Sequence, residues 1–129
     1  MNKISQNDSY LIDNAIQLEK EYSSTCAPFT RVWIYEKRCV VFEGFTFKGI
    51  QLKIDVWINQ SGFEVHFWAC NNDSFDMDKT FKPIIPQLDN FYLNNGHINN
   101  LKYEFQDKRT FLQFFQPFLI ALQNLELNK

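Results

Sequence analysis

Apolar and polar residues alternate strictly on both sides of a short polar turn in the middle of the chain. Before the turn, the apolar positions are Ile50, Leu52, Ile54, Val56 and Ile58. After residues 59–62, the apolar positions are Phe63, Val65, Phe67 and Ala69. A period of two on both sides of a glycine-containing turn is typical of an antiparallel β-hairpin. The pattern predicts a hairpin over residues 50–70, with one apolar face that other elements must cover.

The opposite face of this hairpin carries charged and aromatic side chains. We expect Ile58 to pair with Phe63, which sets the register of the whole hairpin. The polar pairs that face each other are then Lys53 with Trp68, Asp55 with His66, and Trp57 with Glu64. Because opposed β-carbons lie about 4.5–5.5 Å apart, the members of each pair can touch. We therefore expect a cation–π contact in the first pair, and we expect Asp55 to orient the imidazole ring in the second.

The chain before the hairpin predicts one helix and two strands. Apolar residues recur at helical spacing up to Tyr22, and residues 5–8 are suited to cap the start of this helix. β-Branched and aromatic residues then predict strands over residues 31–35 and 39–47, with Gly44 as a β-bulge. Short connections join these strands to the hairpin, so the four consecutive strands should form a meander.

The chain after the hairpin is less regular. Residues 71–78 predict an acidic loop, and two prolines that follow exclude a strand there. Residues 86–92 predict a short helix that ends at the sequence Asn94-Asn95-Gly96, because such residues favour the left-handed conformation at a helix C-terminus. Residues 101–105 alternate again and predict a last strand.

A long C-terminal helix completes the chain, starting near Asp107 or Thr110. Its apolar stripe consists of Phe111, Phe114, Phe115, Phe118, Leu122 and Leu125. Pro117 lacks a backbone N–H and its ring conflicts with the preceding turn, so we expect a kink or a break into two helices. The order of elements predicts one α+β domain over residues 1–129. Its antiparallel β-meander sheet should have about five strands, with the N- and C-terminal helices packed on one face.

Composition and charge narrow the classes of function. The 129 residues include 14 Phe, 5 Tyr and 3 Trp, and the formal net charge is −2 without any basic run. Aromatic side chains could stack on bases, but no cluster of basic residues would hold the phosphates, so we expect no direct binding of nucleic acid. The longest uninterrupted apolar run, residues 118–122, is far too short to span a bilayer, so we expect no membrane partner.

The three cysteines, Cys26, Cys39 and Cys70, lie far apart without the CxxC spacing of a redox or zinc motif. The first eight residues lack the apolar segment of a signal peptide. Together these features predict reduced thiols and a cytoplasmic location. For Cys39 we expect a buried, structural thiol.

Trp57 and Trp68 are the strongest indication of a binding surface. Tryptophan is over-represented at binding hot spots, because it offers a large rigid area and one polar group. Contact with a partner or ligand, and simple cover by another segment, both remain open for these two residues. Asp55 and His66 could form a catalytic pair, but no nucleophile or oxyanion donor accompanies them, so no catalytic residue is assigned.

Asp73, Asp76 and Asp78 make the predicted loop acidic and could offer oxygen ligands to a hard cation. The loop lacks the glycine and the terminal glutamate of an EF-hand. We therefore expect a solvated loop, or an acidic patch for a basic partner, and we expect neither a metal ion nor a cofactor.

The whole-chain pattern resembles the small immunity proteins of bacterial toxin–immunity systems, including those of contact-dependent growth inhibition. The features that carry the resemblance are the mildly acidic 129-residue domain, the hairpin with Trp57 and Trp68 outward, and the absence of a catalytic constellation. The resemblance implies a non-enzymatic protein, favoured as a monomer, that binds one cognate toxin, such as a nuclease domain, and occludes its active site. The partner-binding residues would be Asp55, Trp57, Glu64, His66 and Trp68, with Asp73, Asp76 and Asp78 as an acidic rim.

Two alternatives stay open. A secretion-type chaperone of similar size and acidity would be an obligate dimer with large exposed apolar grooves. A small α+β ligand-binding protein or enzyme would use Asp55 and His66 beside a deep pocket.

Overall fold

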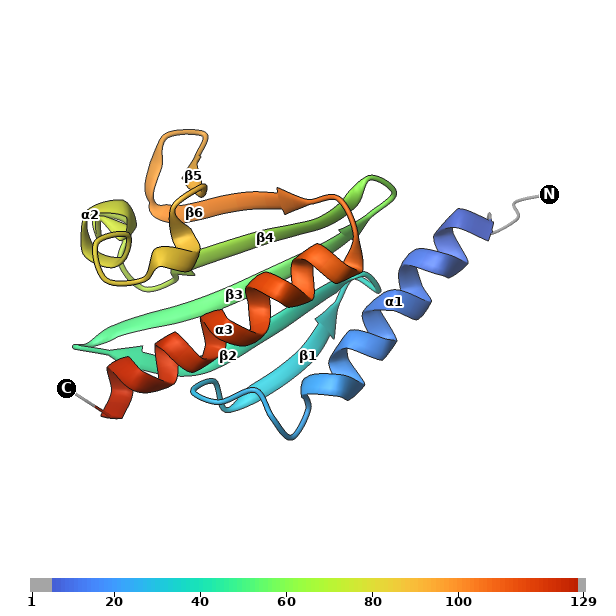
Figure 1. The fold of residues 1–129 in the computed structure, drawn as a ribbon, viewed down its shortest axis with the longest axis horizontal. Coiled ribbons are helices and arrows are strands. Elements are labelled where there is room, and N and C mark those ends of the chain that lie inside the picture. The colour runs from blue at the N-terminus through green and yellow to red at the C-terminus, as the bar shows by residue number, and fades with distance from the viewer. Residues whose placement is uncertain (1–5, 128–129) are drawn as a thin grey trace.

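The computed structural model describes residues 6–127, which form one sheet with helices on one side (Figure 1). The helices are α1 (Gln6–Tyr22), α2 (Met77–Phe81), the short 3-10 helix η1 (Pro86–Leu88) and α3 (Lys108–Leu127). The strands are β1 (Arg31–Tyr35), β2 (Cys39–Phe47), β3 (Ile50–Asn59), β4 (Gly62–Ala69), β5 (Tyr92–Asn94) and β6 (His97–Phe105). All pairings are antiparallel, in the spatial order β1-β2-β3-β4-β6-β5. The predicted α+β class and the meander are confirmed, with six strands instead of about five.

The predicted register of the β3–β4 hairpin is confirmed. The observed pairs include Lys53 with Trp68, Ile54 with Phe67, Asp55 with His66, Trp57 with Glu64, and Ile58 with Phe63. The apolar residues of the two strands are buried in the core except for Ile50, which is half-buried at the strand end. Asp55, Trp57 and Trp68 on the other face are only half-buried. A slip of one residue would reverse both faces, so burial of the apolar set fixes this register.

The predicted bulge at Gly44 is present in β2. The pairing of β2 with β3 shifts between Phe42 and Phe45, so that two residues of β2 face one residue of β3. Gly44 has a φ of +87°, and a Cβ there would lie 1.8 Å from Thr30 Oγ1. Both conformation and space therefore require glycine at this position.

The segment that follows Pro86 differs from the prediction. Only the single turn η1 is helical, and Tyr92–Asn94 forms the edge strand β5. Asn95 and Gly96, with φ of 52° and 78°, connect β5 to β6 as a two-residue turn. Asn-Gly is the preferred pair for a type I′ hairpin turn, because both of its central residues need a positive φ. The same residues that can end a helix here join two strands, and β6 accordingly begins earlier than predicted, at His97.

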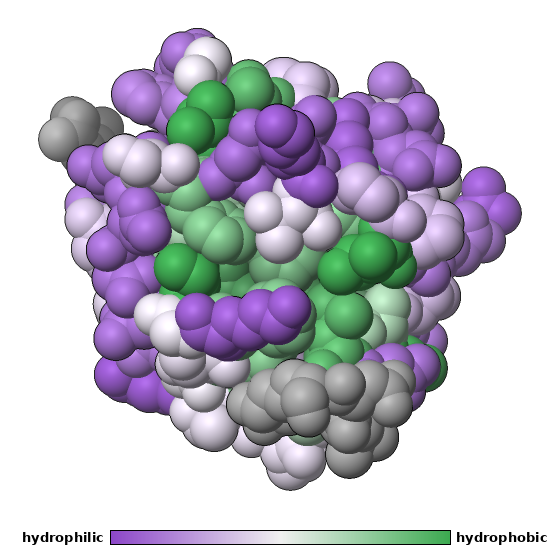
Figure 2. All heavy atoms as spheres, turned by 90° about the vertical axis from the view of Figure 1, so that its left-hand side faces the viewer, coloured by the Kyte–Doolittle hydropathy of each residue, from purple (hydrophilic) through white to green (hydrophobic). Residues whose placement is uncertain are grey.

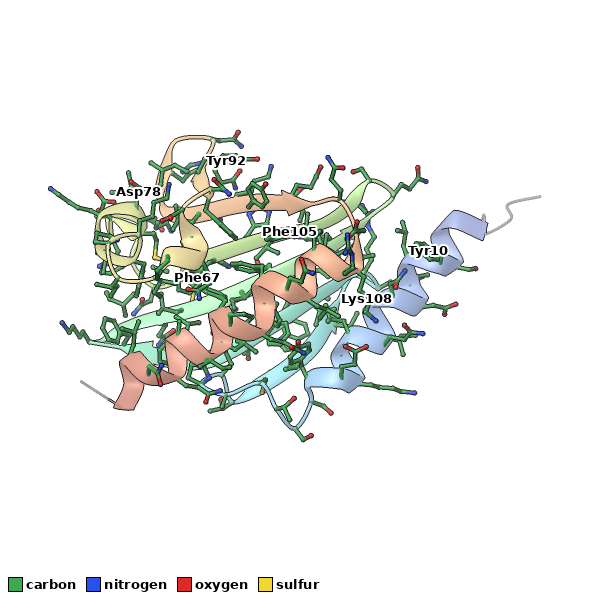
Figure 3. The ribbon with its side chains drawn as sticks, viewed as in Figure 1. Tyr10, Phe67, Asp78, Tyr92, Phe105 and Lys108 are labelled. Atoms are coloured by element: carbon green, nitrogen blue, oxygen red, sulfur yellow. The ribbon has the colours of Figure 1, made fainter. Side chains whose placement is uncertain are left out.

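One hydrophobic core lies between the sheet and the helices. Figure 1 shows α1 and α3 crossing the same face of the sheet, and both contribute buried side chains to this core. Tyr22 of α1 packs edge-on against Phe42 of β2 and Phe115 of α3, at ring-centroid distances of 5.9 and 5.1 Å. Phe67 of β4 lies beside α3 (Figure 3), with its ring 5.1 Å from that of Phe118. The high phenylalanine content of the chain therefore serves this core.

α3 is one continuous helix through Pro117, so of the two expected outcomes the break into two helices does not occur, and the kink stays a prediction. Pro117 is exposed, while Phe118 beside it is fully buried. The carbonyl that loses its helical hydrogen bond belongs to Gln113, an exposed residue whose backbone can bond to water instead. Phe114, Phe115 and Phe118 are buried in the core on the opposite side of the helix, and this packing stabilises helix on both sides of the proline.

Apolar side chains also reach the surface at one end of the molecule. Figure 2 faces the end that holds α2 and the C-terminal part of α3, and shows an apolar centre surrounded by polar side chains. Within residues 6–127, no helix combines the length and the apolar character needed to cross a membrane.

Candidate functional site

The sheet face opposite the helices, called the open face below, gathers polar and large aromatic side chains from five strands. The residues that the pairing places on it are Arg31, Trp33 and Tyr35 of β1, Cys39, Val41 and Glu43 of β2, Lys53, Asp55 and Trp57 of β3, Glu64, His66 and Trp68 of β4, and Asn100, Lys102 and Glu104 of β6. The buried side chains of all described helices belong to the opposite side. The five hairpin residues selected from the sequence therefore share one face, and no described helix covers them.

Three aromatic side chains form a contiguous group on the β1 side of the open face. The ring centroids of Trp33 and Tyr35 lie 6.0 Å apart and those of Tyr35 and Trp57 lie 6.2 Å apart, both pairs edge to face. The guanidinium group of Arg31 lies 5.0 Å from the Trp33 ring, and that of Arg38 lies 6.0 Å from the Trp57 ring. Neighbouring side chains thus hold these rings in place, which gives a partner a preorganised aromatic surface.

Two small apolar residues form the floor of this aromatic group. Cys39 pairs with Tyr35 on one side and Trp57 on the other, and only 1 % of it is exposed. Val41, the next β2 residue on the same face, is also buried. Burial, reinforced by the nearby carboxylate of Asp55, raises the pKa of the Cys39 thiol to about 12. Cys39 is therefore the buried structural thiol that the sequence predicted, and it is not a nucleophile at neutral pH.

Glu43 links the aromatic group to two positive charges. Its Oε1 accepts a hydrogen bond from Trp33 Nε1 at 3.0 Å, and its Oε2 accepts one from Arg31 Nη1 at 3.2 Å. The ammonium group of Lys53 lies 3.6 Å from Oε1. The indole N–H of Trp33, together with Lys53 and Arg31, holds the pKa of Glu43 below its usual range. This carboxylate is therefore fully paired within the protein.

Asp55 has a different environment in the middle of the open face. Trp68 Nε1 donates a hydrogen bond to its Oδ2 at 3.0 Å. Burial raises the pKa of the Asp55 carboxyl, while the charges of His66 and Lys53 and the Trp68 hydrogen bond oppose this effect. Lys53 lies with its ammonium group 6.0 Å from the centroid of the Trp68 ring, which confirms the predicted cation–π contact.

The ring of His66 is oriented by Glu64 and Asn100, so the prediction that Asp55 orients it is wrong. Its Nε2 lies 2.6 Å from Glu64 Oε2, and its Nδ1 lies 3.3 Å from Asn100 Oδ1. Lys102 Nζ lies 3.9 Å from the same oxygen of Glu64. Glu64 is two residues away on the same face of β4, and its longer side chain reaches the imidazole. Asp55 and His66 therefore do not form a hydrogen-bonded pair.

The bulge in β2 leaves a hollow at one end of the open face. Its volume is about 350 Å³, and its lining includes Glu43, Gly44, Thr46, Gln51, Lys53 and Cys70. The absence of a side chain at Gly44 contributes to this space. The thiol of Cys70, which is half-buried there, lies 3.5 Å from the carbonyl oxygen of Gln51. The hollow is of a size to admit one side chain of a partner.

The three residues of the predicted acidic rim do not join the open-face network. The predicted acidic loop ends in a helix: Asp76 caps α2 by accepting a hydrogen bond from the Lys79 backbone N–H at 2.9 Å. Asp78, labelled in Figure 3, forms an ion pair of 3.2 Å with Lys82. Asp73 is exposed in the loop before α2. In the part of the chain that the structure describes, no three metal-ligating side chains come together.

Sequence reasoning confined to the hairpin misses the half of the open face that lies on β1 and β2. Arg31, Trp33 and Tyr35 alternate with apolar residues, and this alternation could have placed them on the open face. The continuation through β2 is hidden, because all four residues of its first part, 39–42, are apolar. Only the register of the sheet shows that Cys39 and Val41 lie between the aromatic residues of β1 and β3.

The chain was compared with family models, with curated proteins and with solved structures, and no significant match was found in any of the three.

Proposed function

We propose that this chain is a protein-binding module of the immunity type, which binds a cognate bacterial toxin domain and neutralises it by occluding the toxin's active site. One observation carries the proposal: an open sheet face, free of described helices, holds four large aromatic side chains within a network of hydrogen bonds and ion pairs.

The aromatic residues of the open face have the properties of hot-spot residues. Trp33 and Trp68 are each fixed by a hydrogen bond to a carboxylate, and Trp57 lies against Tyr35. Fixed side chains lose little entropy when a partner binds. Bulky rings that stay half-buried in the free protein have apolar area left to bury in a complex. Both features indicate a binding surface rather than a sheet face that is only solvated.

The charges of the open face support a protein partner rather than a nucleic acid. Acidic residues alternate with basic ones along the face. Within each of the ion pairs Glu43–Arg31 and Glu64–Lys102, the two opposite charges compensate each other. A surface of mixed sign offers no continuous track for phosphates. It does allow complementary pairing with a protein that presents its own mixed charges around a basic active site.

The test is direct binding to the protein encoded by the neighbouring open reading frame. Trp57→Ala and Trp68→Ala should each cost at least about 2 kcal/mol, or roughly thirtyfold in Kd, measured by calorimetry. Tyr10→Ala is the matched control, because Tyr10 is a highly exposed aromatic residue on α1, outside the open face. Unchanged affinity in both tryptophan variants, or an equal loss with Tyr10→Ala, would refute the proposal. A toxin activity assay with the complex then measures occlusion.

A second candidate is a secretion-type chaperone, favoured by the apolar end of the molecule in Figure 2. A chaperone of this type would be an obligate dimer that binds an unfolded segment. The native mass of the purified chain separates the two candidates: a monomer agrees with the immunity function, and a stable dimer agrees with the chaperone.

A further inference from the structure

The three carboxylates nearest the centre of the open face differ in how they are paired. Glu43 lies within 4.0 Å of two cationic groups, those of Arg31 and Lys53. Glu64 also lies near a cationic group, with the ammonium of Lys102 at 3.9 Å, and the imidazole of His66 lies 2.6 Å from the same oxygen. For Asp55, by contrast, no cationic group of the described residues lies within that distance. Its hydrogen bond comes from the neutral indole of Trp68.

Asp55 lies in a partly buried position, where a carboxylate without a cationic partner is destabilised. Val41 and His66 flank it on the neighbouring strands, and it is only half-buried, so part of it still reaches solvent. A carboxylate taken out of water without a cationic partner is left with much of its desolvation penalty. The raised pKa of this carboxyl is consistent with that shortage of compensation.

Two tryptophan positions lie on either side of Asp55 along the strand direction of the open face. Trp57 follows Asp55 by two residues on the same face of β3, and Trp68 lies on β4 opposite Lys53, two residues before it. Aromatic faces attract cations, and this attraction strengthens where water is excluded. A carboxylate with indoles on both sides is therefore suited to a guanidinium or ammonium group.

We propose that Asp55 receives a basic side chain, arginine or lysine, that the partner protein inserts between Trp57 and Trp68. This inference rests on the proposed function, in which the open face binds a protein. The cation of the partner would complete the charge pattern of the open face, in which Glu43 and Glu64 already lie beside arginine or lysine side chains of the chain itself. It would also cover Asp55 with a group that compensates the loss of water.

The first test uses a small probe and needs no partner protein. The three tryptophan indole N–H signals are followed by NMR, and each is assigned with a Trp→Phe variant. The probe is the blocked tripeptide Gly-Arg-Gly, added to about 50 mM, with Gly-Glu-Gly as the control of opposite charge. The indole signals of Trp57 and Trp68 should move with the arginine peptide only. Asp55→Asn should weaken this binding at least about fivefold, because it removes the charge and keeps the oxygen that accepts from Trp68.

Glu104→Gln is the matched control variant for this experiment. Glu104 lies on the open face as well, but it is exposed on β6, so its loss should leave the peptide affinity unchanged. Absence of any indole shift with the arginine peptide would overturn the inference. An equal shift with the glutamate peptide, or unaltered affinity in Asp55→Asn, would overturn it too.

The second test separates this inference from the proposed function. In the complex with the partner, Asp55→Asn should weaken binding at least about tenfold more than Glu104→Gln does. If Trp57→Ala weakens binding but Asp55→Asn does not, the open face is the binding site and the role of Asp55 is refuted. If neither variant has an effect, the proposed function itself fails.

Discussion

The two faces of the sheet use aromatic side chains in opposite ways. On the covered face, phenylalanine dominates, and residues such as Phe67 and Phe115 are fully buried. On the open face, the large rings are tryptophan and tyrosine, and the indoles of Trp33 and Trp68 bond to carboxylates. A ring without a polar atom suits a permanently dry core, whereas an indole suits a surface that meets water in one state and protein in another.

The comparison separates stability from recognition. On the covered side, one continuous cluster joins the sheet to α1, α2, η1 and α3. On the open side, burial is limited to a shallow floor, of which Cys39 and Val41 are the apolar members. Changes on the covered face should therefore affect folding, and changes above the floor of the open face should mainly affect binding.

The largest effect should be the difference in reactivity between two thiols of the open face. Cys70 lines the hollow and should react readily with an aromatic disulfide reagent at pH 8. A pKa of about 12 leaves on the order of one Cys39 thiol in ten thousand ionised at that pH. Rates measured on variants with a single cysteine should differ at least about a thousandfold. Denaturant should abolish the difference, and comparable rates in the native protein would show that the floor is open to solvent.

The next largest effect concerns the free energy of unfolding. Phe115→Ala should cost about 3–5 kcal/mol in urea denaturation, because this ring is fully buried and packs against Tyr22 and Phe42. Trp57→Ala, on the open face, should cost less than half as much, since its ring is only half-buried. Equal losses would contradict the separation of the two faces and would make Trp57 a core residue.

The sequence predicts the covered face better than the open one. Strict alternation in residues 50–69 determines the register, and burial on one side enforces it, so the pairs of Asp55 and Trp57 could be predicted. Which hydrogen bonds a polar face makes depends on side-chain reach instead. The imidazole of His66 faces Asp55 in the register, yet it bonds to Glu64 along its own strand.

Prediction from the local sequence fails where the same residues are compatible with two different structures. Asn95 and Gly96 suit both a helix end and a tight hairpin turn, and the choice depends on whether β6 can pair with the segment before them. Pro117 similarly carries a local penalty that its tertiary surroundings outweigh. In both places tertiary packing decides between local alternatives.

A smaller effect on the covered side should come from Pro117→Ala. The substitution restores a backbone N–H that can bond to the carbonyl of Gln113, so the free energy of unfolding should rise by about 1–3 kcal/mol. Gln113→Ala is the control, because Gln113 is an exposed residue one turn earlier in α3 and the variant keeps both of its backbone hydrogen-bonding groups. It should change stability by no more than about 0.5 kcal/mol. A loss of stability in Pro117→Ala would mean that packing of α3 requires the proline.

The smallest effect should be the pH-dependent difference in the free energy of unfolding between Asp55→Asn and the wild type. The folded protein raises the pKa of Asp55 above the value of about 3.9 in an unfolded chain. The folded state therefore binds a proton more tightly, and this contribution to stability is lost as pH rises through the folded pKa. Asp55→Asn cannot ionise, so it should equal the wild type near pH 3 and be more stable at pH 7. Parallel urea titrations of the two proteins measure the difference, in which the other carboxyl groups cancel. If Asp55→Asn is instead the less stable protein at pH 7, then the ionised carboxylate is already compensated in the free protein and has no need of a partner's cation.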